Sequence, residues 1–104
     1  MTAAMADEDE RAFDAIVIHA DDDVAVALRD LRSGDTVRVR RQGSTSRVTV
    51  GDAVPLGHKF ALHAIAVGAD VHKYGESIGT AVAAIAEGAH VHVHNIASRR
   101  ARPK

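Results

Sequence analysis

The sequence predicts a mainly β fold of short, bent strands with one or two short helices. Its clearest signal is a repeated frame of the form apolar-x-x-Gly-x-x-apolar, and segments that alternate apolar and polar residues support it. A glycine at one fixed place suggests a turn with positive φ, from which the chain enters a strand. Four such turns in roughly 60 residues imply many short strands and leave no room for a solenoid of whole repeats. The four copies are Leu31/Gly34/Val37, Val54/Gly57/Phe60, Ile65/Gly68/Val71 and Ile85/Gly88/Val91.

The elements can be assigned in order along the chain. A β-branched run within residues 13–19 predicts the first strand. Three consecutive aspartates then precede apolar residues spaced i, i+3, i+4 and i+7, which predicts a short amphipathic helix over residues 24–31. Residues 37–40 and 47–50 alternate apolar and polar side chains on either side of Gln42-Gly43-Ser44, and this pattern predicts a hairpin.

Composition indicates one small domain with unstructured ends. The chain has 104 residues, no Cys and a formal net charge of -1. These values exclude a disulfide framework and a thiolate zinc site, and they give no reason to expect nucleic acid. No apolar run is long enough for a membrane helix and the acidic start is not a secretory signal, so a cytoplasmic location is expected. We expect a disordered acidic arm at residues 1–12, a domain at 13–97 and a basic tail at 98–104.

Histidine is the unusual component, because there are seven and six of them follow residue 57. The strongest local signal is His90-Val91-His92-Val93-His94. In a strand these histidines share one face, while the two valines point to the other face and can enter the core. Such an H-x-H pair is a workable chelate for Zn, Fe or Mn-type ions, and the alternative is a solvated strand face that happens to carry histidine. A chain too small to enclose a deep pocket would supply only part of a site.

Residues 57–59 and Tyr74 each allow a functional and a simpler interpretation. His58 and Lys59 follow Gly57 on a turn, where they would offer a general base and an ammonium group to a carboxylate. The simpler interpretation is an exposed polar turn. Tyr74, one of three aromatic residues, is either a packing residue or the wall of a site.

Three other histidines lie outside these segments. His19 precedes the acidic residues 21–23, where a carboxylate neighbour would keep it protonated or orient it. His63 and His72 lie in strand-like segments and are expected to be surface or packed residues.

Four blocks of sequence, in the right order, resemble the amino-terminal domain of the altronate dehydratase family. This family also includes the small (alpha) subunit of sulfolactate sulfo-lyase and, more distantly, galactarate dehydratase. The resemblance runs from about Ile16 to Asn95, nearly all of the chain that is expected to be ordered. The matching blocks are Ile18-His19-Ala20 with residues 22–28, Gly57-His58-Lys59-Phe60-Ala61-Leu62, Val71-His72-Lys73-Tyr74-Gly75 with Ile78-Gly79, and Gly88-Ala89-His90-Val91-His92-Val93-His94-Asn95.

The resemblance implies a SAF domain, a β-clip fold of short, sharply bent strands, which agrees with the repeated glycine turns. It also implies a partner, because in these lyases the domain works with a much larger catalytic domain or subunit that is not part of this chain. The family removes water or sulfite from a 2-hydroxy acid to give a 2-oxo acid, usually with a divalent metal such as iron or manganese. We therefore expect a large lyase subunit and a small anionic 2-hydroxy acid as partners, no membrane or nucleic-acid partner, and self-association of the isolated chain as an option.

Carried over by position, the resemblance implies roles for individual side chains. Elimination β to a carboxylate needs a base for the α-proton, an acid for the leaving hydroxyl, and cationic or metal stabilisation of the enediolate-like intermediate. The expected catalytic residues are His19, His58 and Lys59, and the expected substrate-binding residues are Asn95 and Tyr74. The expected metal ligands are His92 and His94. They would bind a divalent metal ion (Fe2+ or Mn2+) at a site that the large subunit completes.

One position departs from the family pattern. The altronate type usually has Asp-Asn-Val-Ala-Val where this chain has Asp22-Asp23-Val24-Ala25-Val26, so a carboxylate replaces an amide at position 23. That carboxylate would repel an anionic sugar acid in contact with it, which leaves open a different substrate or a structural helix N-cap role for Asp23. Three functions stay open: the small subunit of a hydro-lyase that converts a 2-hydroxy sugar acid to a 2-keto-3-deoxy acid, the alpha subunit of a sulfolactate sulfo-lyase, and a stand-alone SAF binding or assembly module without catalysis.

Overall fold

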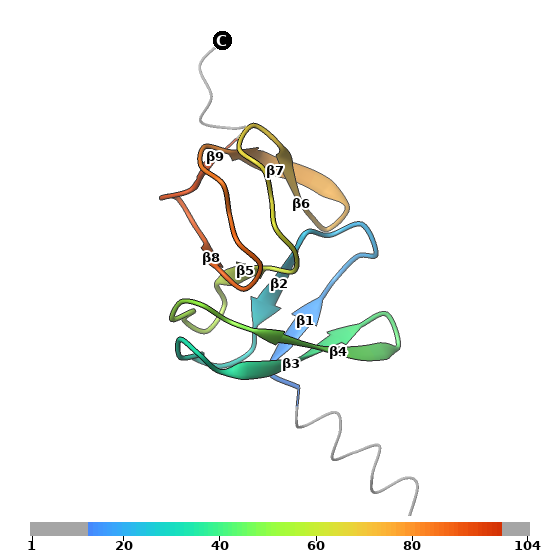
Figure 1. Cartoon of the computed structure of the whole chain (residues 1–104). Helices are drawn as coiled ribbons and strands as arrows, with labels where there is room; N and C mark the ends of the chain where they lie inside the picture. Colours follow the sequence, from blue (N-terminus) through green and yellow to red (C-terminus); the bar gives the residue numbers. More distant parts are fainter. Residues whose placement is uncertain (1–12, 99–104) are drawn as a thin grey trace, which may run out of the picture.

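Short strands make up all the regular structure of the part of the chain that the structure describes, residues 13–98 (Figure 1). In this computed structural model those residues form nine strands and no helix, so the mainly β prediction is confirmed. None of the described residues belongs to a helix capable of crossing a membrane. The predicted acidic arm at residues 1–12 and, apart from Ser98, the predicted basic tail at residues 98–104 lie outside the described residues.

The strands are divided between two sheets. Their bounds are β1 Ala15–Val17, β2 Val24–Ala27, β3 Thr36–Arg41, β4 Ser44–Thr49, β5 Lys59–Ala61, β6 Asp70–Lys73, β7 Glu76–Ala81, β8 His90–Val91 and β9 Ile96–Ser98. The first sheet has the order β4-β3-β1-β2-β5-β8, in which β1 and β3 are parallel and all other neighbours are antiparallel. The second sheet is antiparallel with the order β6-β7-β9, and Figure 1 shows it at the opposite end of the molecule from β3 and β4.

The predicted helix over residues 24–31 is wrong. Val24–Ala27 form β2, which pairs with β1 on one side and with β5 on the other. Three of its four residues are buried. A central strand that is buried on both faces has no polar face, so its residues do not show the alternation typical of a strand. Such a continuous apolar run also fits the spacing of an amphipathic helix, which explains the wrong prediction. Leu28, which the helix would have turned toward the core, is 48% exposed. The aspartates before β2 therefore have no helix to cap.

Two hairpins have two-residue turns. Gln42 and Gly43 join β3 to β4 with φ values of 47° and 85°, a conformation that matches the twist of a hairpin. This confirms the predicted hairpin. Tyr74 and Gly75 join β6 to β7 in the same way, with φ values of 58° and 77°. This second hairpin was not predicted, because the sequence Tyr-Gly is a weaker turn signal than a pair such as Asn-Gly.

The repeated glycine frame is confirmed as a repeated turn. Its four glycines all have positive φ, from 85° to 93°, and a strand begins two residues after each of them. Each turn makes two reciprocal backbone hydrogen bonds with one residue elsewhere in the chain. The N–H of the glycine donates to the carbonyl of that residue, and the N–H of that residue donates to the carbonyl of the residue that follows the glycine. At Gly88 the distant residue is Ala61, with N···O distances of 2.8 and 3.0 Å. The apolar positions of the frame are all buried: Leu31, Val37, Val54, Phe60, Ile65, Val71, Ile85 and Val91.

Two hydrophobic cores lie on opposite faces of β2 and β5. Ala25 and Phe60 belong to one core, whereas their chain neighbours Val24 and Ala61 belong to the other. This division follows from strand geometry, because successive side chains point to opposite faces. Since both of its faces are covered, β5 has a fixed backbone, and the polar residues at its start are held in place with it.

Replacement of a frame glycine by alanine tests the turns. A β carbon on Gly88 would collide with the carbonyl oxygen of Thr49, whereas one on Gly68 would meet nothing within 4 Å. Gly68→Ala should lower the free energy of unfolding by about 1–2 kcal/mol, the cost of the left-handed conformation. Gly88→Ala should lower it by about 1–3 kcal/mol more, because overpacking is added. Urea unfolding measures both values, and equal losses would contradict the close approach of Thr49.

Candidate functional site

Four histidines gather where β8 pairs with β5. Glycine turns deliver His58 to the start of β5 and His90 to the start of β8, and the pairing of these strands places the two rings together. Nδ1 of His58 lies 2.9 Å from Nε2 of His90. The ring centroid of His92 lies 4.5 Å from that of His58 and 5.4 Å from that of His90, and the His94 ring lies 5.5 Å from that of His90. We refer to these four residues as the histidine cluster.

A turn, not a strand, places the later members of the histidine cluster. The expected strand with alternating histidines and two core valines is wrong, because β8 ends at Val91 and Val93 is 82% exposed. Asn95 folds the chain back at this point. Its Oδ1 accepts the N–H of His92 at 3.0 Å, and its Nδ2 donates to the carbonyl of His90 at 2.8 Å. An asparagine side chain can replace the partner strand in this way.

Buried and acidic groups hold the backbone of the histidine cluster. Asn95 is only 8% exposed, so its amide acts on the turn; its predicted role in binding substrate stays a prediction. The carboxylate of Asp52 accepts the backbone N–H of His90 at 2.9 Å. His58 is fixed through its own backbone, which donates to the carbonyl of Pro55 and accepts from Ala27. The rings therefore project from a restrained main chain.

Lys59 lies beside the histidine cluster and is half-buried. Burial lowers the pKa of its ammonium group, and the positive charge of Lys73 lowers this pKa further. Burial also lowers the pKa of His90 and of His92, with added repulsion from neighbouring imidazoles and, for His92, from Lys59. Since the ordinary histidine pKa is 6.5, both rings are mainly neutral at pH 7. A neutral imidazole can accept a proton or bind a metal ion.

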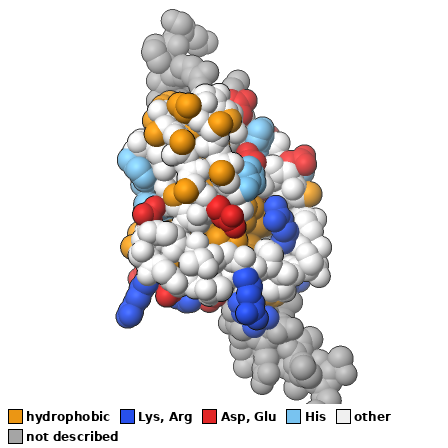
Figure 2. All heavy atoms as spheres, viewed as in Figure 1, with side chains coloured by type: hydrophobic (Ala, Val, Ile, Leu, Met, Phe, Trp, Pro, Cys, Tyr) orange, Lys and Arg blue, Asp and Glu red, His pale blue; other side chains and the backbone are white. Residues whose placement is uncertain are grey.

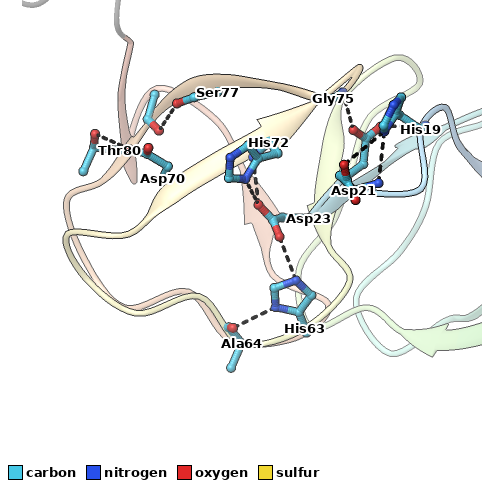
Figure 3. Close-up of polar contacts among 12 residues, drawn as sticks. His19, Asp21, Asp23, His63, Ala64, Asp70, His72, Gly75, Ser77 and Thr80 are labelled. Carbon is cyan, nitrogen blue, oxygen red and sulfur yellow. Dashed lines mark hydrogen bonds and ion pairs between the residues drawn. The ribbon is translucent and has the colours of Figure 1, made fainter.

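A second group of polar side chains surrounds Asp23 (Figure 3). Its Oδ2 accepts the backbone N–H of His72 at 2.8 Å and lies 2.8 Å from Nδ1 of the same residue. Its Oδ1 lies 2.9 Å from Nε2 of His63, whose Nδ1 lies 2.9 Å from the carbonyl of Ala64. The suggested N-cap role of Asp23 is wrong, because the strand β2 directly follows it. His63 and His72 are partly exposed, and their shared carboxylate was not predicted.

His19 and Tyr74 make their contacts at the tip of the β6–β7 hairpin. The buried carboxylate of Asp22 accepts backbone N–H groups of His19 at 3.0 Å and of Gly75 at 2.9 Å. The ring of His19 lies so close to Gly75 that a β carbon there would come within 3.0 Å of it. Tyr74 is 57% exposed, and Nζ of Lys73 lies 4.7 Å from its ring centroid. Tyr74 therefore belongs to neither hydrophobic core, and its predicted role in substrate binding stays a prediction.

The predicted site residues therefore fall into two groups. His58, Lys59, His92, His94 and Asn95 come together at β5 and β8. Tyr74 lies in the tip of the β6–β7 hairpin, and His19, between β1 and β2, lies against that tip. His90 is central to the first group, although the sequence-based prediction assigned the metal ion to His92 and His94. The H-x-H pattern included it, but its contact with a residue 32 positions earlier depends on strand pairing.

Comparison with known proteins places these residues in a family context. A family model described as the altronate/galactarate dehydratase SAF domain matches residues 13–99. Altronate dehydratase of Escherichia coli (strain K12) is 56% identical over 80 residues, which cover 77% of this chain and 15% of that protein. Subunit alpha of (2R)-sulfolactate sulfo-lyase of Chromohalobacter salexigens is 38% identical over 92 residues, which cover 86% of this chain and 98% of that subunit. Altronate dehydratase of Bacillus subtilis (strain 168) is 41% identical over 80 residues, with coverage of 77% and 15%.

Two substitutions at Asp23 separate its hydrogen bonds from its charge. Asp23→Ala should lower the free energy of unfolding by about 1–3 kcal/mol, because the part-buried N–H of His72 loses its acceptor. Asp23→Asn keeps an oxygen for His72 and offers an N–H to His63, so it should lose less than half as much. Chemical denaturation at pH 7 measures both, and equal losses for the two variants would contradict this account.

The same carboxylate predicts a dependence of stability on pH. Burial raises the pKa of Asp23, but hydrogen bonds from His72 and His63, together with the charge of His63, outweigh burial and bring the pKa below 3.8. A group whose folded pKa is lowered stabilises the fold above its unfolded pKa, and this stabilisation is lost as the pH falls through the folded pKa. The stability advantage of the natural chain over Asp23→Asn should therefore shrink as the pH falls from about 5 to about 2. A constant difference in denaturation midpoints over this range would overturn the prediction.

Proposed function

This chain belongs to the altronate/galactarate dehydratase SAF domain family, and from that premise we propose that it is the small subunit of a lyase that converts a 2-hydroxy acid to a 2-oxo acid together with a larger catalytic subunit. The observation that carries the proposal is the histidine cluster beside Lys59. All of these side chains are at least partly exposed. A second protein surface can therefore cover them and complete a site around a small substrate.

The chemistry of such a lyase needs the kinds of groups found here. A base takes the proton from C2, the leaving group departs from C3 as water or sulfite, and the enol that forms becomes the 2-oxo acid. His58 and Lys59 are the candidates for this base and for holding the substrate carboxylate. Burial and Lys73 both lower the pKa of Lys59, which raises its neutral fraction at pH 7. His19, whose ring lies against Gly75 in the hairpin tip, is the third candidate.

A divalent metal ion fits the donor set of the histidine cluster. Imidazole nitrogens are suitable ligands for iron, manganese and zinc ions. When bound, such an ion would hold oxygen atoms of the substrate and neutralise negative charge that develops on them. Lys59 and Lys73 would attract the anionic substrate to the same place, because each carries positive charge when protonated.

Exposed apolar side chains support a protein partner. Val67, Val82 and Val93 are 63%, 54% and 82% exposed. Figure 2 shows apolar side chains gathered at the end of the molecule that carries the second sheet. Gathered apolar surface is typical of interaction sites, whereas isolated exposed apolar residues are ordinary. A partner that covers Val93 would also cover the histidine cluster, because Val93 lies between two of its members.

The relatives favour two substrate classes, one by higher sequence identity and the other by nearly equal chain length. Identity is higher to the E. coli altronate dehydratase, at 56%, but the chain spans only 15% of that protein. The chain spans 98% of the C. salexigens sulfo-lyase alpha subunit at 38% identity. We propose a hydro-lyase that acts on a 2-hydroxy sugar acid as the first candidate, and a sulfolactate sulfo-lyase as the second. A binding or assembly module without turnover is the remaining alternative.

Co-expression with a large lyase subunit from the same organism tests the proposal. The two chains should co-purify, and the complex should form 2-oxo acid from a 2-hydroxy sugar acid that neither chain consumes alone. Release of sulfite from (2R)-sulfolactate would identify the second candidate. A stable complex without either activity would support the binding module, and absence of a complex would overturn the proposed partnership.

Substitution of Lys59 tests its role within that complex. Lys59→Met should lower kcat at least about 100-fold, because a proton-transfer or charge-holding group is lost. Arg47→Met is the matched control: it removes an exposed cation from β4, at the far edge of the six-stranded sheet from β8, and should leave kcat within about twofold. An active complex in which both variants turn over normally would exclude Lys59 from the reaction.

A further inference from the structure

The three most closely grouped nitrogens of the histidine cluster have the spacing of a metal site. One ring nitrogen from each of His58, His90 and His92 lies within 4.8 Å of the other two. Ligands about 2.1 Å from a metal ion, at angles of about 90–109°, lie about 3.0–3.4 Å apart. The distance of 2.9 Å between Nδ1 of His58 and Nε2 of His90 is close to that spacing. The third nitrogen, on the partly exposed His92 ring, lies within 4.8 Å of the other two, and rotation of this ring would close the remaining distance.

The backbone of the three residues is held before any ion arrives. Asp52 fixes the N–H of His90, and Asn95 joins His90 to His92 through both ends of its amide. The N–H of His58 donates to the carbonyl of Pro55 at 2.9 Å. Restraint of this kind lowers the entropy lost when ligands converge on a metal ion, and supporting contacts commonly change metal affinity 10–100-fold.

We infer that His58, His90 and His92 bind one divalent transition-metal ion on this chain alone, with His94 outside the ligand set. Three imidazoles leave coordination positions open for water or substrate oxygens, as in catalytic and not in closed structural sites. His94 is excluded on geometry: its ring is exposed and contacts only that of His90 within the cluster, at 5.5 Å. This differs from the pair His92 and His94 that the sequence predicts. The inference relies on the proposed function only for its biological role.

The assignment also changes what His58 can do. A ring nitrogen that binds a metal ion cannot act as the base, so Lys59 becomes the nearest candidate for proton transfer in the region. The charges around the site are the cations Lys59 and Lys73 and the carboxylate of Asp52. With two cations and one anion nearby, the site would hold an anionic oxygen ligand well once the metal ion is bound.

Titration of Co2+ into the full chain, followed by its visible absorption and by calorimetry, tests the inference without any partner. We expect one ion per chain. His58→Ala and His92→Ala should each weaken binding at least tenfold, whereas His94→Ala and the control His63→Ala should stay within about twofold. All four side chains are partly exposed, and circular dichroism verifies that each variant is folded.

The outcomes separate this inference from the proposed function. Absence of saturable binding, or binding that survives His58→Ala and His92→Ala, would overturn the three-histidine site even if the two-subunit enzyme is active. Loss of binding in His94→Ala would replace it with the pair predicted from sequence. Binding with the expected pattern would support the site even if no lyase activity is found.

Discussion

The histidine cluster depends on one contact, the reciprocal backbone hydrogen bonds between the Gly88 turn and Ala61. These bonds dock β8 beside β5 and so bring His90 next to His58. The turn has no room for a side chain, because the Thr49 carbonyl lies where a β carbon would be. A slip of one residue in this pairing would turn the side chains of β8 to the other face. The position of a single glycine thus sets the geometry of the candidate site.

Much of the fold is local enough to predict from sequence. The four glycine turns and the β3–β4 hairpin are visible because turn chemistry depends on adjacent residues. The failure at β2 has the opposite cause. Val24–Ala27 have no strong local preference, and the pairing with β1 and β5 decides their conformation. The β6–β7 hairpin was missed because Tyr74 adopts a positive φ that its residue type seldom favours.

The candidate site is less predictable, because its contacts join residues far apart in the chain. The resemblance to a family supplied His58, Lys59 and His92 individually, but not their grouping with His90. Asp23 binds His63 and His72 across 40 and 49 residues, and no spacing along the sequence indicates such contacts. Two adjacent carboxylates therefore do different structural work: Asp22 ties the turn before β2 to the hairpin tip, and Asp23 ties it to β6.

The sharing of β2 and β5 between two cores has a consequence for how the domain comes apart. Because β2 and β5 contribute side chains to both cores, opening one core exposes one face of these strands and so weakens the other core. Local opening that spares half of the molecule is therefore costly, and the described chain is built to unfold as one cooperative unit. We therefore expect amide protons of β2 and β5 to exchange slowly, since global unfolding is needed to free them. His58 directly precedes β5, and His90 begins β8, which pairs with β5. The candidate site is thus attached to a strand that we expect to remain folded until the whole domain unfolds.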